Sequence, residues 1–176
     1  SIYGARHLAS VWDDKKIVLK KKKSTISSNQ NAEDIKEKEN HQENEEEEFI
    51  EAEKNAIELI DAFILLDLIG FKEPPLILNY FSQTSKLYGR AQRIEKRLKQ
   101  KNMLNNLEDE LYFGTTAVLP RQMEDDHIPF LQRGVPIFHI MPYQFPTVWH
   151  TSSDNAQAIS YPISDDFVRI FTVFVA

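Results

Sequence analysis

The distribution of apolar and polar positions predicts an α/β chain. Nearly continuous apolar runs at residues 62–68 and 135–141 favour buried strands that are covered on both faces. Four other segments are predicted to be helices: 1–12, 51–60, 86–101 and 130–133. In 1–12 and 86–101 the apolar residues recur at helical spacing, and Gly134 ends the short helix at 130–133. Ser164 or Asp165 is predicted to cap a last helix. Strands separated by helices indicate a sheet with helices on its faces.

Residues 20–55 interrupt this pattern with a charged, low-complexity stretch. They hold seven lysines and eleven acidic residues, a net charge of −4 out of −6 for the whole chain. Few aromatic or β-branched residues are present to offset the loss of chain entropy, so we predict a disordered insertion between 1–19 and 56–176. A solvated insert without activity is favoured over a charged tail that binds a partner.

Composition narrows the class of protein. The chain has 176 residues and 41% apolar residues, enough for one modest domain with a core. It has no cysteine, which excludes a disulfide framework, a thiolate nucleophile and a zinc site built from cysteines. Its apolar run at 57–66 is too short to cross a bilayer, which takes roughly 20 residues. No targeting segment is visible, and the chain looks like a piece of something longer.

The predicted helix at 86–101 carries a basic outer face, with seven lysines and arginines against Glu95. Such a face could contact phosphates. The chain has no net positive charge and no nucleic-acid motif, so we favour a solvated face and expect no nucleic-acid partner.

Acidic residues supply the first candidate chemistry. Asp67 ends an apolar run, where an unpaired charge would cost several kcal/mol, so it needs a hydrogen-bonding partner or an altered protonation state. Strand ends line the functional crevice of open α/β sheets, although a structural role at a turn fits as well. Asp125 and Asp126 precede His127, and one acid could cap a helix while the other faces a cleft.

The histidines are weaker signals by themselves. His150, in the segment VWHT, could bind zinc, but the HExxH and HxH spacings are absent. His139 lies within a predicted strand and fits a core residue, and His127 fits a structural role. The chain has no GxSxG elbow and no glycine-rich phosphate loop, which argues against serine hydrolases and nucleotide-dependent enzymes.

Four segments together form a recognisable pattern: SIYGARHLAS, FILLDLIG, EDDHIPFLQRGVPIFHI and FPTVWHT, in this order. They closely resemble the C-terminal half of glutaminyl-peptide cyclotransferases, relatives of the M28 zinc aminopeptidases. The resemblance covers about 1–12 and 57–176. It implies a mixed, mostly parallel central sheet with helices on both faces, incomplete in this chain, and a single zinc ion. It also implies conversion of N-terminal glutamine of peptides or proteins to pyroglutamate with release of ammonia.

The resemblance also implies roles for individual residues. By position, His150 matches the family's histidine zinc ligand. Asp67 and Asp125 match two aspartates that form a hydrogen-bond network with a catalytic glutamate and tune its protonation. In such a reaction the substrate's own α-amine is the nucleophile, so the enzyme needs a Lewis acid and a group that moves protons. The lack of a cysteine or of a serine-hydrolase motif is therefore expected for this reaction.

Substrate contacts follow from the same resemblance. Trp149 matches a family residue that forms an aromatic wall against the substrate, and Phe145 matches a residue of the substrate pocket. Met123 and Glu124 match positions at the edge of that pocket. The family's other two zinc ligands and its catalytic glutamate lie upstream of the first matched segment. Because a catalytic zinc site needs about three protein ligands, we expect the isolated chain to be inactive.

Three readings of the function remain open. The first is a zinc-dependent glutaminyl cyclase, of which this chain is the C-terminal part. The second is an M28-type zinc aminopeptidase. A third is a truncated, non-catalytic homologue that acts by interaction. The resemblance further implies residence in the secretory pathway, and we expect a monomer.

Overall fold

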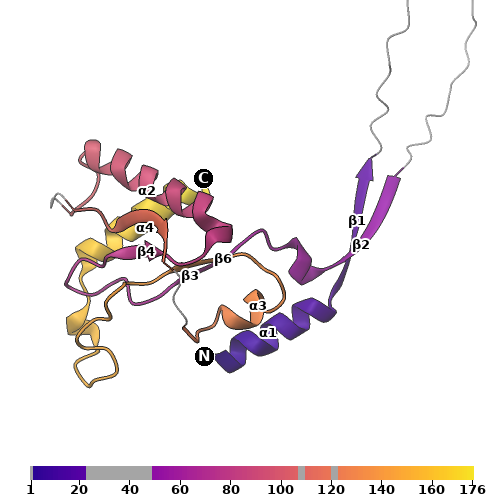
Figure 1. Ribbon diagram of the computed structural model, residues 1–176, viewed down its shortest axis with the longest axis horizontal. Helices are drawn as coiled ribbons and strands as arrows, with labels where there is room; N and C mark the ends of the chain where they lie inside the picture. The colour runs from indigo at the N-terminus through magenta and orange to yellow at the C-terminus, as the bar shows by residue number, and fades with distance from the viewer. Residues whose placement is uncertain (1, 23–48, 107–109, 120–122) are drawn as a thin grey trace, which may run out of the picture.

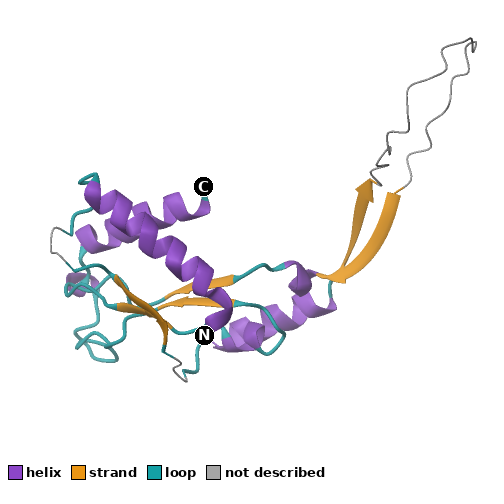
Figure 2. Ribbon diagram, turned by 45° about the horizontal axis from the view of Figure 1, so that its top comes forward, coloured by secondary structure: helices purple, strands orange, loops and turns teal. Residues whose placement is uncertain are grey.

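Two pairs of parallel strands lie among helices, and a two-stranded ribbon projects away from them (Figure 1). The computed structural model describes residues 2–22, 49–106, 110–119 and 123–176. The same division between a helix-covered body and a projecting ribbon is visible after rotation (Figure 2). The predicted α/β class, with mostly parallel strand pairs, is confirmed.

β3 (Phe63–Leu66) and β6 (Ile137–Ile140) form the central parallel pair. They occupy the middle of the two predicted apolar runs. Phe138 and Ile140 belong to one hydrophobic core, whereas Ile137 belongs to another. Because successive strand residues point to opposite faces, these two cores cover both faces of β6.

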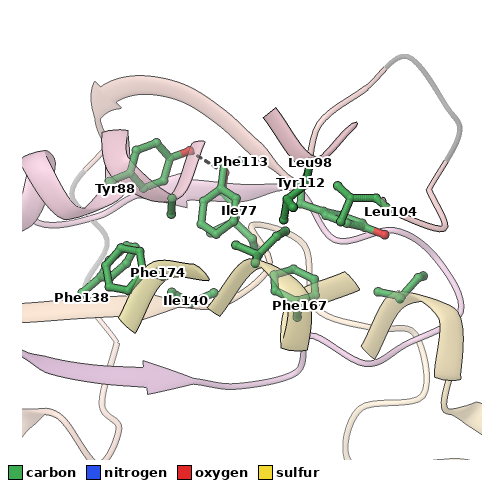
Figure 3. Close-up of a cluster of buried hydrophobic side chains, with 13 residues drawn as sticks. Ile77, Tyr88, Leu98, Leu104, Tyr112, Phe113, Phe138, Ile140, Phe167 and Phe174 are labelled. Atoms are coloured by element: carbon green, nitrogen blue, oxygen red, sulfur yellow. Dashed lines mark hydrogen bonds between the residues drawn. The ribbon is translucent and has the colours of Figure 1, made fainter. Parts of the chain in front are cut away.

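The larger core lies beneath α2 (Ser85–Gln100) and α4 (Tyr161–Val175) (Figure 3). The helix predicted at 86–101 is confirmed. The last helix begins earlier than expected, because the Ser160 side chain accepts the N–H of Ile163 at 3.4 Å and caps it. The predicted caps, Ser164 and Asp165, therefore lie inside α4.

β4 (Ile77–Asn79) and β5 (Phe113–Val118) form a second parallel pair that the sequence pattern did not predict. β4 has only three residues, all of them buried. β5 buries Phe113 but exposes most of its other side chains, so neither strand shows a clear alternation. The 3₁₀ helix η2 (Ser82–Thr84) links β4 to α2.

The smaller core joins α1 (Ile2–Asp14) to α3 (Ile128–Leu131). α1 confirms the helix predicted at 1–12. α3 begins two residues before the predicted 130–133, and Gly134, at φ 81°, follows it in the left-handed conformation that suits glycine. Arg133 Nε donates to Asp13 Oδ2 at 3.1 Å and ties the two helices together.

The ribbon corrects two predictions. β1 (Lys16–Lys22) pairs antiparallel with β2 (Phe49–Asn55), so residues 20–22 and 49–55 are strand rather than disordered insertion. The helix predicted at 51–60 is also wrong: β2 is followed by the 3₁₀ helix η1 (Ala56–Leu59). Seven residues of each strand pair across the ribbon, and one of these pairs, Lys20 and Glu51, forms an ion pair at 2.8 Å. The rest of the predicted insertion, 23–48, lies outside the described residues.

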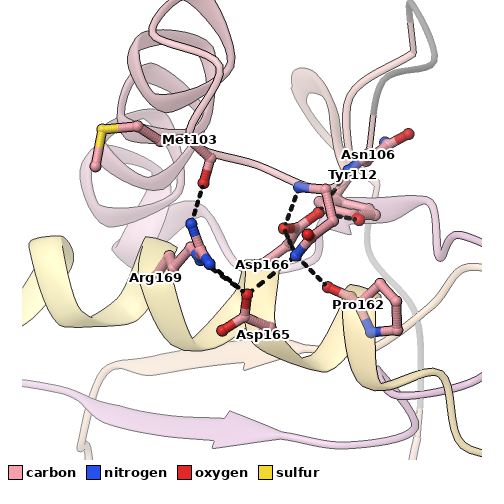
Figure 4. Close-up of polar contacts among 8 residues, drawn as sticks. Met103, Asn106, Tyr112, Pro162, Asp165, Asp166 and Arg169 are labelled. Atoms are coloured by element: carbon pink, nitrogen blue, oxygen red, sulfur yellow. Dashed lines mark hydrogen bonds and ion pairs between the residues drawn. The ribbon is translucent and has the colours of Figure 1, made fainter.

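Two buried carboxylates fix the approach to β5. Glu95 of α2 accepts the N–H groups of Tyr112 at 2.5 Å and Phe113 at 3.0 Å. Asp166 of α4 accepts the Tyr112 hydroxyl at 2.8 Å and the backbone N–H groups of Asn105 and Asn106 (Figure 4). The two carboxylates thereby satisfy the backbone donors of the buried Tyr112 and Phe113 and of the more exposed Asn105 and Asn106.

Across the residues that the structure describes, no helix combines the length and apolar character needed to span a membrane. A third short 3₁₀ helix, η3 (Ala156–Ala158), precedes α4.

Candidate functional site

Asp67 lies directly after β3, at the carboxyl end of the central strand pair. Its N–H donates to the carbonyl of Ile140 at 3.0 Å, which fixes the backbone there. Leu68 follows with φ 55°, a conformation that is rare for a leucine. Ligands of open α/β sheets bind at such strand ends, so the structure places Asp67 where the prediction requires it.

Burial and neighbouring acids change the protonation of Asp67. Burial raises the pKa of its carboxyl group, and the negative charges of Asp125 and Asp126 raise it further. The backbone N–H of Leu68 opposes part of this rise in pKa. Asp67 therefore retains a proton at higher pH than an ordinary aspartate does.

Asp125 contacts a histidine that the sequence pattern assigned only to the core. His139 Nε2 lies 3.2 Å from Asp125 Oδ2, and the imidazole is fully buried. The pKa of His139 is lowered to about 4, mainly by burial and also by the nearby His127, while Asp125 opposes part of this shift. At neutral pH the imidazole is thus uncharged.

The register of the central pair explains why His139 reaches this position. His139 lies beside Leu65, two residues before Asp67, and shares a strand face with Ile137. The two-residue periodicity of β6 could have placed His139 on one face, but the pairing with β3 was needed to bring it near Asp67. The role of His139 was therefore missed.

His127 completes the buried group. Its ring centroid lies 4.8 Å from that of His139 and 5.6 Å from that of Phe81. Burial lowers the pKa of His127, while Asp125 and Asp126 oppose this effect. The Nδ1 atoms of both histidines are buried and have no hydrogen-bond partner among the described residues.

The donor atoms of the clustered side chains show whether this group suits a metal ion. Asp125, His127 and His139 place potential ligand atoms within 4.8 Å of one another, as no other group of three does in the described part of the chain. A carboxylate and two uncharged imidazoles are donors that zinc accepts. His150, the predicted zinc ligand, does not belong to this group. The described residues thus offer one three-donor group and, separate from it, the exposed imidazole of His150.

The predicted ligand His150 lies in a loop with the two predicted aromatic contacts. Its ring stacks on Trp149 at a centroid distance of 3.8 Å, and Trp149 lies 4.5 Å from Phe145. His150 has φ 60°, another left-handed residue that is not glycine. The Trp149 N–H donates to the carbonyl of Pro146 at 2.9 Å, which closes the turn.

Two adjacent cavities open beside this loop. The first, here the Trp149 cavity, has a volume of about 140 Å³ and is lined in part by Trp149. The second, here the Phe145 cavity, has a volume of about 370 Å³ and is lined in part by Phe145. Both are also lined by Leu68, Phe71 and Pro146. Leu68 follows Asp67, which forms an acidic cluster with Asp125 and Asp126, although none of these three acids lines either cavity.

Met123 and Glu124 were predicted at the pocket edge. Met123 is half-buried and Glu124 is exposed, and they lead into Asp125. Neither residue lines the Trp149 cavity or the Phe145 cavity. Their role in substrate binding stays a prediction.

Fold and sequence together define the class of protein. The profile of peptidase family M28 matches residues 1–175, and the chain belongs to that family. Within it, the chain is similar to glutaminyl-peptide cyclotransferases, as the sequence motifs predicted. It is 44% identical to the Boiga dendrophila glutaminyl-peptide cyclotransferase over 121 residues, which are 69% of this chain and 33% of that protein. The Drosophila melanogaster glutaminyl-peptide cyclotransferase is 33% identical over 182 residues, covering 99% of this chain and 40% of the relative.

Solved structures agree with this relationship. The crystal structure of Macrostomum lignano glutaminyl cyclase matches with a TM-score of 0.71 and 29% identity, over 100% of this chain and 47% of that one. Acidobacteriales bacterium glutaminyl cyclase shares the fold at a TM-score of 0.54 and 21% identity. The chain spans between a third and a half of the length of these relatives.

Proposed function

We propose that the full-length protein is a zinc-dependent acyltransferase that converts the N-terminal glutamine of peptides or proteins to pyroglutamate. Two observations support this proposal: the charges of Asp67 and Asp125 interact, and Trp149, packed on Phe145, lines a cavity together with Leu68, the residue after Asp67. The names of the similar proteins support the same chemistry.

The reaction is an intramolecular acyl transfer. The substrate's α-amine forms a bond to its own side-chain carboxamide carbon, and the bond from that carbon to the amide nitrogen breaks. The α-amine loses a proton and the leaving nitrogen gains one, so that ammonia departs. The protein must therefore hold the side chain folded toward the amine and move a proton between the two nitrogens.

Acidic residues of this chain suit the task of moving a proton between the two substrate nitrogens. Asp67, whose pKa is raised by burial and by Asp125, can share a proton with neighbouring carboxylates. The uncharged His139 imidazole lies next to Asp125 within the cluster, with Nε2 3.2 Å from Oδ2. We assign to Asp67 and Asp125 the tuning of a catalytic glutamate that the resemblance places upstream of the matched segments.

Trp149 and Phe145 suit the task of holding the substrate's glutamine side chain folded toward its α-amine. Their rings pack together and line adjacent cavities, so they present a rigid apolar surface to the substrate. We propose that the N-terminal glutamine lies against this surface. Met123 and Glu124 are proposed to approach the substrate from the segment before Asp125.

We propose that His150 supplies one zinc ligand. The remaining ligands would come from the family's upstream segment. Bound zinc supplies Lewis-acid polarisation of the carboxamide carbonyl. The buried Asp125, His127 and His139 group is the competing location for the metal.

The direct test is to incubate the full-length protein with a peptide that begins with glutamine. We expect ammonia release and a product that lacks a free α-amine. Asp67→Asn and Asp125→Asn should each lower kcat by about tenfold or more, while Asp61→Asn, an exposed acid outside the cluster, should not. Absence of ammonia and of pyroglutamate with the wild-type protein would overturn the proposal.

Membership of peptidase family M28 favours one second candidate, a zinc aminopeptidase. Its reaction would use water to cleave the first peptide bond. The same incubation separates the two activities, because an aminopeptidase releases a free amino acid and leaves a shortened peptide. We also propose, from the resemblance alone, residence in the secretory pathway, which immunolocalisation of the full-length protein would test.

A further inference from the structure

The Phe145 cavity has no role in the chemistry proposed above. With a volume of about 370 Å³ it lies within the usual range of ligand pockets, and it is the larger of the two cavities beside the loop that holds Trp149. Its walls come from Leu68, Phe71 and two continuous segments, residues 73–76 and 142–147. If the Phe145 cavity binds substrate, the site extends beyond the N-terminal glutamine to later residues of the peptide.

The two walls are tied to each other, so the cavity is preformed. The Tyr143 N–H donates to the Leu76 carbonyl at 2.8 Å, and Ile77 forms an isolated bridge with Pro142. Proline residues stiffen both walls: Pro74, Pro75, Pro142 and Pro146. A ligand that enters would therefore pay little conformational entropy in ordering the protein.

The cavity continues the surface proposed to bind glutamine. Phe145 lines it and packs at 4.5 Å on Trp149, and Leu68, next to Asp67, lines it together with the Trp149 cavity. A peptide advances roughly 3.3–3.6 Å per extended residue. When the first residue lies against Trp149, one of the next two side chains can therefore reach the Phe145 cavity.

The lining residues define which side chain would be accepted. The prolines and the leucine and phenylalanine side chains offer apolar surface for an aliphatic stem, while Tyr143, Gln144 and Thr147 add polar groups to the lining. Glu73 is the one charged residue in the lining, it is exposed, and no ion pair joins it to another described residue. Arginine and lysine combine a long apolar stem with a positive head group, which matches such walls and this carboxylate.

We propose that the Phe145 cavity is a subsite for the second or third residue of the peptide substrate, with preference for arginine or lysine set by Glu73. This subsite rests on the proposed cyclase function. Glu73 acts as a specificity residue and takes no part in the bond changes. The carboxylate is exposed, so the preference should be modest and should shrink as salt concentration rises.

The experiment compares kcat/KM of the full-length protein for peptides with glutamine first and arginine, alanine or glutamate at position two or three. The wild type should prefer arginine over alanine by about two- to fivefold at one of these positions. Glu73→Gln should remove this preference and leave turnover of the alanine peptide unchanged, and Glu73→Lys should shift it toward glutamate. Glu58→Gln, an exposed acid outside both cavities, is the matched control and should keep the arginine preference.

The two proposals fail in different ways. Equal kcat/KM for all peptides in the wild type, or an arginine preference that survives both Glu73 substitutions, would overturn the subsite while cyclisation continued. Lack of cyclisation of every peptide, including the alanine peptide, would instead overturn the proposed function and the subsite that rests on it. A Glu73→Gln variant that loses turnover of the alanine peptide would contradict a pure specificity role.

Discussion

At the scale of single residues, backbone strain marks the two ends of the candidate site. Leu68 adopts φ 55° directly after Asp67, and His150 adopts φ 60° directly after Trp149. A left-handed conformation costs a residue other than glycine on the order of 1–3 kcal/mol and persists only where surrounding structure enforces it. Both strained residues directly follow a predicted site residue, so the strain lies next to Asp67 and Trp149 in the chain.

The location of the metal can be decided by substitution of single histidines in the full-length protein. We expect His150→Ala to lower the zinc content strongly, because loss of one of about three protein ligands leaves an incomplete site. His139→Ala should keep its zinc, and His7→Ala, an exposed histidine of α1, serves as the control. Metal content is measured by elemental analysis after dialysis, with circular dichroism to check folding. Zinc lost from a folded His139→Ala protein but kept by His150→Ala would place the metal in the buried group instead.

Sequence reasoning reached part of this site for identifiable physical reasons. Asp67 and Asp125 stood out because acids are costly at the ends of apolar runs or next to other acids, and the structure brings both into one cluster. His139 did not stand out, since its role depends on parallel pairing between segments far apart in the chain. His150 and Trp149 were selected only through resemblance, and their functional roles stay predictions.

At the scale of secondary-structure elements, Glu95 couples α2 to the start of β5. Its side chain is 1% exposed, and it accepts two backbone N–H groups. Burial raises the pKa of Glu95 to about 7, against the opposing effects of these hydrogen bonds and of Lys99, while Asp166 adds to the rise. A folded-state pKa above the unfolded value means that the protonated form stabilises the fold.

This coupling predicts a pH dependence of stability. The contribution of Glu95 should be complete below about pH 4.5, its ordinary pKa, and should be lost as the pH rises through about 7. We therefore expect the free energy of unfolding of the wild type, minus that of Glu95→Gln, to be larger at pH 5 than at pH 8. The expected change is on the order of 1–3 kcal/mol. Urea denaturation of the full-length proteins at both pH values measures it.

Taking the difference between two proteins removes the contributions of groups that titrate in both. Asp67, with a raised pKa, and His139, with a lowered one, would otherwise add opposite slopes to the stability curve. Glu58→Gln, an exposed substitution of the same type, should show no such pH dependence. A wild-type minus Glu95→Gln difference that is equal at pH 5 and pH 8 would contradict the assigned burial effect.

A helix or strand could be predicted where the apolar pattern within its own segment was sufficient to identify it. α2 has a complete amphipathic pattern, and β3 and β6 lie within continuous apolar runs, so all three were found. β4 and β5 depend on each other for pairing and burial, and the ribbon depends on partners across a long intervening segment. Periodicity within one segment does not record such non-local pairing, which is why these strands were missed.

At the scale of the whole molecule, the ribbon of β1 and β2 stands apart from the helix-covered body (Figure 2). Its seven paired positions run from Lys16 beside Asn55 to Lys22 beside Phe49. Residues 20–55 also carry −4 of the chain's net charge of −6, so the body is nearly neutral. The strands β1 and β2, which flank most of this charged segment, therefore project away from the body that carries the candidate site.

Replacement of residues 23–48 by an Asn-Gly turn tests whether this segment contributes to activity. Because Lys22 and Phe49 are paired, a two-residue turn can close the ribbon without changing its register. We expect kcat/KM for a glutamine-initiated peptide to stay within about twofold of wild type, and Tm to stay equal or rise slightly, since loop closure becomes less costly. Deletion of 20–55, which also removes the Lys20 and Glu51 pair, is the harsher comparison and should lower Tm. A large loss of activity from the 23–48 replacement alone, with Tm unchanged, would show that the segment takes part in function.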